Sequence, residues 1–146
     1  MEADETARSA ALRLLDVFIG EWSMETSGEA RTVFEWALDG QFLVQRSQTP
    51  HPGAPDSVAI VGLDPGGETY SQHYFDSRGI ARVYAMTFSE GVWKLLREKP
   101  DFSPLAFSQR FTGTFSDDCN AIAGLWEIRT ASRWERDFPL TYTRVE

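Results

Sequence analysis

The residue of this chain best suited to acid–base chemistry is His73, at the centre of the segment 70–76. An imidazole titrates near neutral pH, so His73 is the obvious candidate for a general base. If the segment is a β-strand, alternation places His73 on the same face as Phe75 and opposite Gln72. The sequence does not decide which face lines an interior. A structural or outward-facing histidine is the alternative interpretation.

The next predicted strand places a cation and a phenol on one face, where Arg82 and Tyr84 are followed by Met86. A cation, a phenol and apolar groups in register are typical of a pocket wall for an amphipathic or anionic small molecule. Ordinary barrel core with an arginine reaching the rim is the alternative. We predict a ligand-binding wall made of residues at mid-strand positions: Trp36, His73, Arg82, Tyr84, Met86, Trp93, Gln109 and Trp126.

No catalytic signature accompanies these residues. The chain contains neither a phosphate-binding glycine loop nor a Gly-x-Ser-x-Gly elbow. The two histidines, His51 and His73, have no metal-binding spacing with each other or with Cys119. His51 lies between two prolines and is expected in an exposed loop. We therefore expect no metal and no cofactor.

The other polar residues that draw attention have structural interpretations. Glu35 and Arg46 flank a predicted hairpin turn and are expected to pair across the sheet. Asp76 and Arg78 flank another turn, which favours a local structural role over catalysis. Cys119 occupies a turn position that favours residues such as glycine, and we expect its side chain to be exposed.

Composition narrows the classes of partner. The chain has 146 residues and a formal net charge of −8, which argues against nucleic acid and anionic membranes as partners. No apolar stretch approaches the roughly 18–20 residues that span a bilayer. The first five residues are acidic, unlike a secretory signal, and a single cysteine forms no internal disulfide. These features predict a cytoplasmic protein.

Periodicity and turn signals predict a single domain over residues 1–146, with one helix and an all-β remainder. Apolar residues at helical spacing predict a helix at about 5–18, and Gly20 is placed to stop it. Short connections between the later segments imply an antiparallel meander, and closing it into a barrel over about 21–145 removes its two edges. A barrel of about ten strands has room for a ligand, and the helix would plug one end or lie across it. The predicted strands are 21–26, 29–37, 41–48, 57–63, 69–76, 80–89, 92–98, 106–115, 121–130 and 134–145.

Several stretches resemble known families. The sequence LLDVFIGEW at 14–22 is similar to the opening of nitrobindin-like and fatty-acid-binding-protein-like barrels, where a short helix leads through Gly-x-Trp into the first strand. Four further stretches resemble a bacterial domain-of-unknown-function family with a lipocalin-like (calycin) barrel: 34–43, 72–79, 107–113 and 137–144. This resemblance covers nearly the whole chain. The resemblance implies the fold but does not imply any activity, because that family has no agreed function.

The similarity to nitrobindin does not extend to haem. In nitrobindin-like proteins the axial ligand is a histidine near the C-terminal end, whereas residues 134–142 of this chain contain none. Tyr142 and His73 are the remaining candidate ligands. Tyr142 would need a nearby base or cation to lower its pKa, and Arg144 is the only evident helper on its face, whereas His73 lies on a different strand and would hold the porphyrin in a different pose. We therefore expect no haem.

Three hypotheses about function remain. In the first, the cavity binds a small hydrophobic or amphipathic molecule. In the second, the same cavity houses a cofactor-independent isomerase or cyclase, with His73 as base, Tyr84 as acid and Arg82 as anion anchor. In the third, the protein is a homodimeric interaction module whose outer barrel face is the functional surface. The absence of a catalytic signature favours the first.

Overall fold

The computed structural model describes residues 2–25, 29–50, 54–67, 69–101 and 104–145. Its elements are an α-helix, a 3-10 helix and ten strands. No helix in these ranges is both long enough and apolar enough to cross a membrane. The bounds are α1 (Glu2–Arg13), η1 (Leu14–Phe18), β1 (Gly20–Glu25), β2 (Glu29–Ala37), β3 (Phe42–Gln48), β4 (Ser57–Leu63), β5 (Tyr70–Asp76), β6 (Ala81–Ser89), β7 (Val92–Arg97), β8 (Ser108–Phe115), β9 (Ala121–Arg129) and β10 (Glu135–Arg144).

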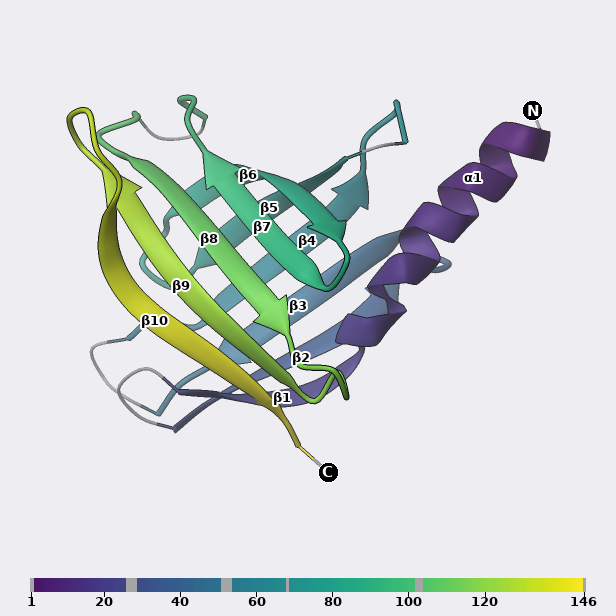
Figure 1. Ribbon diagram of the computed structural model, residues 1–146, viewed down its shortest axis with the longest axis horizontal. Helices are drawn as coiled ribbons and strands as arrows, with labels where there is room; N and C mark the ends of the chain where they lie inside the picture. Colours follow the sequence, from purple (N-terminus) through teal and green to yellow (C-terminus); the bar gives the residue numbers. More distant parts are fainter. Residues whose placement is uncertain (1, 26–28, 51–53, 68, 102–103, 146) are drawn as a thin grey trace.

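The strands form a closed antiparallel barrel in which each strand pairs with its neighbours in the sequence (Figure 1). The first and last strands complete the ring, with Trp22 of β1 opposite Arg144 of β10. The predicted fold class is confirmed, and the strand bounds agree with prediction to within two residues. Closure leaves no unpaired edge among the described strands, and avoiding such edges is the reason that a barrel was predicted.

The predicted helix at 5–18 is correct in position but not uniform. The α-helix ends at Arg13, and the chain continues as the tighter η1 to Phe18. In a 3-10 helix, side chains three positions apart lie on one face, so Leu15 and Phe18 both point into the barrel and are fully buried. The N-terminal part of α1 extends beyond the barrel (Figure 1).

Phe18 plugs one end of the barrel. Its ring lies 5.0 to 5.2 Å, centroid to centroid, from the rings of four residues on the surrounding strands. Three of these four contacts are edge-to-face, and such contacts stabilise beyond the apolar area that they bury. This end of the barrel is therefore filled by side chains. The four rings are those of Phe34, Phe88, Trp93 and Phe115.

Arg144, at the end of β10, holds the segment around Phe18 in place. Its guanidinium stacks on Trp22 at 4.1 Å and donates to the carbonyl oxygens of Val17 and Ile19 at 2.7 and 2.8 Å. It also donates to the carbonyl of Cys119 at 3.0 Å.

The prediction that Cys119 is exposed is wrong, because this residue is half-buried against the core. Its φ of +62° is the glycine-like conformation that the turn requires.

The predicted cross-strand pair on the outer surface is confirmed. Glu35 Oε1 lies 3.2 Å from Arg46 Nε, and both side chains are about half-exposed. An exposed pair of this kind contributes little to stability. It nevertheless shows that β2 and β3 adopt the expected register around their hairpin turn.

Candidate functional site

A cavity of about 500 Å³ occupies the part of the barrel that the plug leaves empty. Thr49, Pro55 and Phe107, which come from connections at the end opposite η1, line its mouth. A volume of this size lies within the range of about 300–1,000 Å³ that is usual for small-molecule sites. The barrel therefore provides a chamber that is closed at one end and open at the other.

Aromatic rings from neighbouring strands form the floor and one wall. The rings of Trp93 and Phe111 lie 4.9 Å apart, and those of Phe111 and Trp126 lie 5.2 Å apart. Two paired glycines, Gly113 and Gly124, make room for this wall, since a Cβ at Gly124 would come within 2.5 Å of the Phe111 ring. The wall is thus an apolar, rigid surface suited to a hydrophobic ring or chain.

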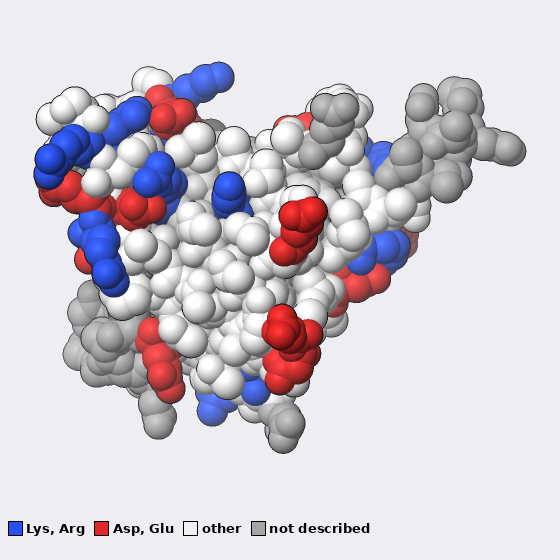
Figure 2. Space-filling model, viewed as in Figure 1, with Lys and Arg blue, Asp and Glu red and all other residues white. Residues whose placement is uncertain are grey.

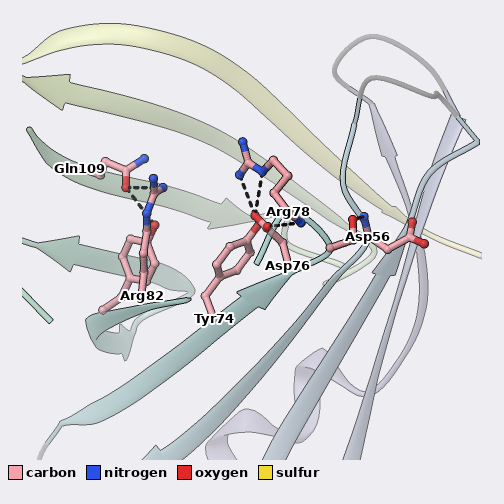
Figure 3. Close-up of polar contacts among 8 residues, drawn as sticks. Asp56, Tyr74, Asp76, Arg78, Arg82 and Gln109 are labelled. Carbon is pink, nitrogen blue, oxygen red and sulfur yellow. Dashed lines mark hydrogen bonds and ion pairs between the residues drawn. The ribbon is translucent and has the colours of Figure 1, made fainter. Parts of the chain in front are cut away.

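A polar cluster interrupts the aromatic wall. Arg82 Nη1 donates to Gln109 Oε1 at 3.1 Å (Figure 3). Tyr84 Oη donates to the same oxygen at 3.0 Å. Burial raises the pKa of Tyr84, so its phenol stays protonated and remains a donor at neutral pH. All three residues line the cavity. The cluster therefore presents hydrogen-bond donors and one positive charge to the interior.

A second cluster lies at the cavity mouth. The side chain of Asp76 is 0% exposed and accepts hydrogen bonds from Tyr74 Oη at 2.9 Å and Arg78 Nη2 at 2.6 Å (Figure 3). Burial alone would raise the pKa of Asp76, but the hydrogen bonds from Arg78 and Tyr74 outweigh it and lower the pKa to about 2. Burial and the bond to Asp76 raise the pKa of Tyr74. The predicted local role of Asp76 and Arg78 is confirmed, but Tyr74 and Arg78 also line the cavity.

The Asp76 cluster predicts a specific response to acid. The folded-state pKa of about 2 lies below the ordinary value of 3.8, so the ionised carboxylate stabilises the fold above about pH 4. That stability is lost as the pH falls through 2. Asp76→Asn is expected to lower the free energy of unfolding by about 1–2 kcal/mol at pH 7, because the half-exposed Arg78 is partly screened. Urea denaturation between pH 7 and pH 2 measures this difference.

The matched control is Glu35→Gln, which removes an exposed ion pair and is expected to cost less than about 1 kcal/mol at pH 7. The difference between wild type and Asp76→Asn should shrink below pH 4. A difference that stays constant down to pH 2 would contradict the assigned pKa.

The charged residues that line the cavity are all arginines. Among the described lining residues, Arg78 and Arg82 carry charge, and none is a carboxylate, histidine, lysine or cysteine. Arg78 is paired with Asp76, as is the nearby buried Arg97 with Asp101. Arg82 has no carboxylate within ion-pair distance in the described part of the chain. Arg82 therefore places a positive charge without an ion-pair partner among the described residues in the cavity, although the protein as a whole is acidic.

The structure brings together five of the residues predicted to form a ligand-binding wall. These residues come from β6, β7, β8 and β9 and all line the one cavity. Whether they hold a ligand stays a prediction. The five are Arg82, Tyr84, Trp93, Gln109 and Trp126.

The predicted placement of His73 in the wall is wrong. His73 is exposed on the outer face of β5, opposite Ile60 and Val83 in the adjacent strands. Alternation did not decide which face of β5 points into the barrel. In the structure it is the face of Gln72, which lines the cavity. His73 therefore cannot act on a molecule in the cavity together with Tyr84 and Arg82. Phe75 and Ile60, also partly exposed, share this outer face.

Trp36 and Met86 also lie outside the cavity. Trp36 is at the plugged end, where its indole donates to Asp16 Oδ1 at 2.7 Å and Arg13 stacks on its ring at 4.2 Å. Met86 is almost completely buried in the core, opposite Tyr70. Both residues have the inward orientation that alternation predicts. They lie too close to the plug to reach the open chamber.

Gln45 and Gln72 also line the cavity, although neither was predicted as a site residue. Gln45 and Gln72 are almost completely buried, which is unusual for glutamine. Alternation could have predicted that both side chains point inward. Gln45 shares a strand face with the buried Leu43, and Gln72 shares one with the buried Tyr70.

The described residues do not fit a metal or haem site in this cavity. No group of three or more histidine, cysteine, aspartate or glutamate residues is placed to hold a metal ion in those ranges. Burial raises the pKa of Tyr142 to about 12, so its phenol stays protonated and is a poor iron ligand. His73 points outward. His51 lies outside the described residues.

No family model matches the chain, and no curated protein sequence is significantly similar to it. The likeness to a lipocalin-like family stays a prediction based on the sequence stretches given above.

Proposed function

We propose that this protein binds a small amphipathic molecule with an anionic group inside the barrel cavity. The observation that carries the proposal is the unneutralised Arg82 beside an aromatic wall. The apolar part of such a ligand would pack against Trp93, Phe111 and Trp126. Each Å² of apolar surface removed from water would contribute roughly 25 cal/mol.

Arg82 is the anchor that we assign to the anionic group. A guanidinium has five N–H donors, and Arg82 uses one of them on Gln109. The remaining donors match the paired oxygens of a carboxylate, sulfonate or phosphate. Gln109 accepts a hydrogen bond from the guanidinium and is itself held by Tyr84, so Arg82 is pre-positioned and less entropy is lost on binding.

The charges at the rim do not by themselves select an anion. Figure 2 shows side chains of both signs interspersed at the upper left, over the end of the barrel where β9 and β10 join. Arg129 pairs with Glu98 at 3.0 Å, and Arg133 and Arg136 are followed in the sequence by Glu135 and Asp137. The proposed anion preference therefore rests on Arg82 inside the cavity.

Calorimetric titration with 2-naphthoic acid tests the anchor. Arg82→Met is expected to weaken binding of 2-naphthoate about tenfold, equivalent to about 1.4 kcal/mol, because the charge-assisted bonds are lost. The uncharged analogue 2-naphthamide should bind wild type and variant equally.

Arg46→Met on the outer face is the matched control and should leave both affinities unchanged. Equal binding of 2-naphthoate by wild type and Arg82→Met would contradict the assignment.

A further inference from the structure

Gln72 lies in the cavity wall with its amide unused. Its side chain is 4% exposed and lines the cavity. No described residue provides it with a hydrogen-bond partner, whereas Gln45 donates to Thr32 Oγ1 at 3.2 Å and Gln109 accepts two bonds. The indole nitrogen of Trp93 is also unpartnered, but it is completely buried, so a ligand in the cavity does not reach it. Gln72 is thus a free donor and acceptor at the cavity surface.

An unused amide in this position constrains what fills the cavity. Water satisfies the amide while the chamber is hydrated, and a ligand displaces that water. A saturated hydrocarbon tail would leave the N–H and C=O groups of Gln72 buried without partners, which is unfavourable. A ligand with its own polar group at this point avoids the loss.

The register places this amide close to the proposed anion anchor. Gln72 pairs with Tyr84 across β5 and β6, and Tyr74 pairs with Arg82. Gln72 and Arg82 are therefore diagonal neighbours on the inner face, with Cα atoms about 7–8 Å apart. A molecule the size of one or two fused rings spans such a separation.

We propose that the ligand is bifunctional: besides its anionic group, it carries a neutral hydroxyl or carbonyl group that hydrogen-bonds to the amide of Gln72. This inference rests on the proposed function and narrows its ligand to compact oxygenated acids. Saturated fatty acids do not belong to this class. The Gln72 amide binds either group, because it both donates and accepts.

Calorimetry with matched acids tests this inference. The probes are 2-naphthoic acid, its 5-, 6- and 7-hydroxy isomers, and 6-methyl-2-naphthoic acid as a size control. We expect at least one hydroxy isomer to bind wild type tenfold more tightly than 2-naphthoate, whereas the methyl compound gains nothing similar. This comparison needs no variant and does not depend on one folding.

The variant Gln72→Met should abolish the hydroxyl preference and leave the affinity for 2-naphthoate within threefold of wild type. Gln48→Met is the matched control, since Gln48 lines the cavity but is exposed at its mouth. It should keep the preference. The inference is overturned if no hydroxy isomer is preferred, or if the preference survives in Gln72→Met. Failure of 2-naphthoate and every isomer to bind would overturn the proposed function itself.

Discussion

Replacing Arg144 by methionine is expected to lower the free energy of unfolding by about 3 kcal/mol, because it removes charge-assisted hydrogen bonds and leaves their acceptors without a donor. The guanidinium is the shared donor for the end of η1 and the β8–β9 turn, and it covers Trp22 at 4.1 Å. Methionine replaces the stem of the side chain and none of the donors. The acceptors at stake are the carbonyl oxygens of Val17, Ile19 and Cys119 and the side-chain oxygen of Asn120.

Urea denaturation followed by circular dichroism measures this effect. Arg31→Met is the matched control, because Arg31 forms an exposed ion pair with Glu21 at 3.3 Å and its loss should cost below about 1 kcal/mol. Arg144→Lys keeps the charge without the planar fork of donors and should fall between the two. Equal costs for Arg144→Met and Arg31→Met would show that the plug is held by apolar packing alone.

Filling the cavity should abolish binding. Ala59 of β4 is buried and lines the chamber, with Gln45 and Tyr74 as its cross-strand partners. In Ala59→Trp, the new ring would occupy the space that the ligand needs. We expect the affinity for 2-naphthoate to fall about a hundredfold or more, equivalent to about 2.8 kcal/mol. Calorimetric titration measures this change.

The control for cavity filling is Ala85→Trp, which adds the same ring on the exposed outer face of β6. This variant should bind 2-naphthoate as wild type does. Thermal unfolding of both variants verifies that each is folded. Retained affinity in a folded Ala59→Trp would place the binding site outside the barrel.

The strands could be predicted because local signals and global closure agree in this sequence. Glycine-containing turns such as Asp39-Gly40 separate short β-rich runs, and each connection is too short for anything other than an antiparallel neighbour. Positive φ angles at Asp39 and Gly40 show that this turn needs such residues. The pairing of β1 with β10 followed from the cost of leaving two open edges.

The site could be predicted only in part. Alternation shows which side chains share one face of a strand. It does not show whether that face points into the barrel or how far along the barrel each side chain lies. Strand β5 carries aromatic and polar residues on both faces, so its pattern did not decide between His73 and Gln72. Trp36 and Trp93 both point inward, yet only Trp93 borders the open chamber. That difference depends on how far Phe18 reaches into the barrel, which is a tertiary property.

The most direct test of the central claim uses the indole N–H signals of the five tryptophans. Trp93 and Trp126 line the cavity, whereas Trp36 lies behind the plug and Trp134 stacks on Arg110 at 4.3 Å. In a 1H–15N correlation titration with 2-naphthoic acid, binding inside the barrel predicts saturable shifts of the Trp93 and Trp126 signals, with the Trp36 and Trp134 signals unchanged. Shifts confined to Trp36 and Trp134, or no saturable shift of any indole, would contradict it.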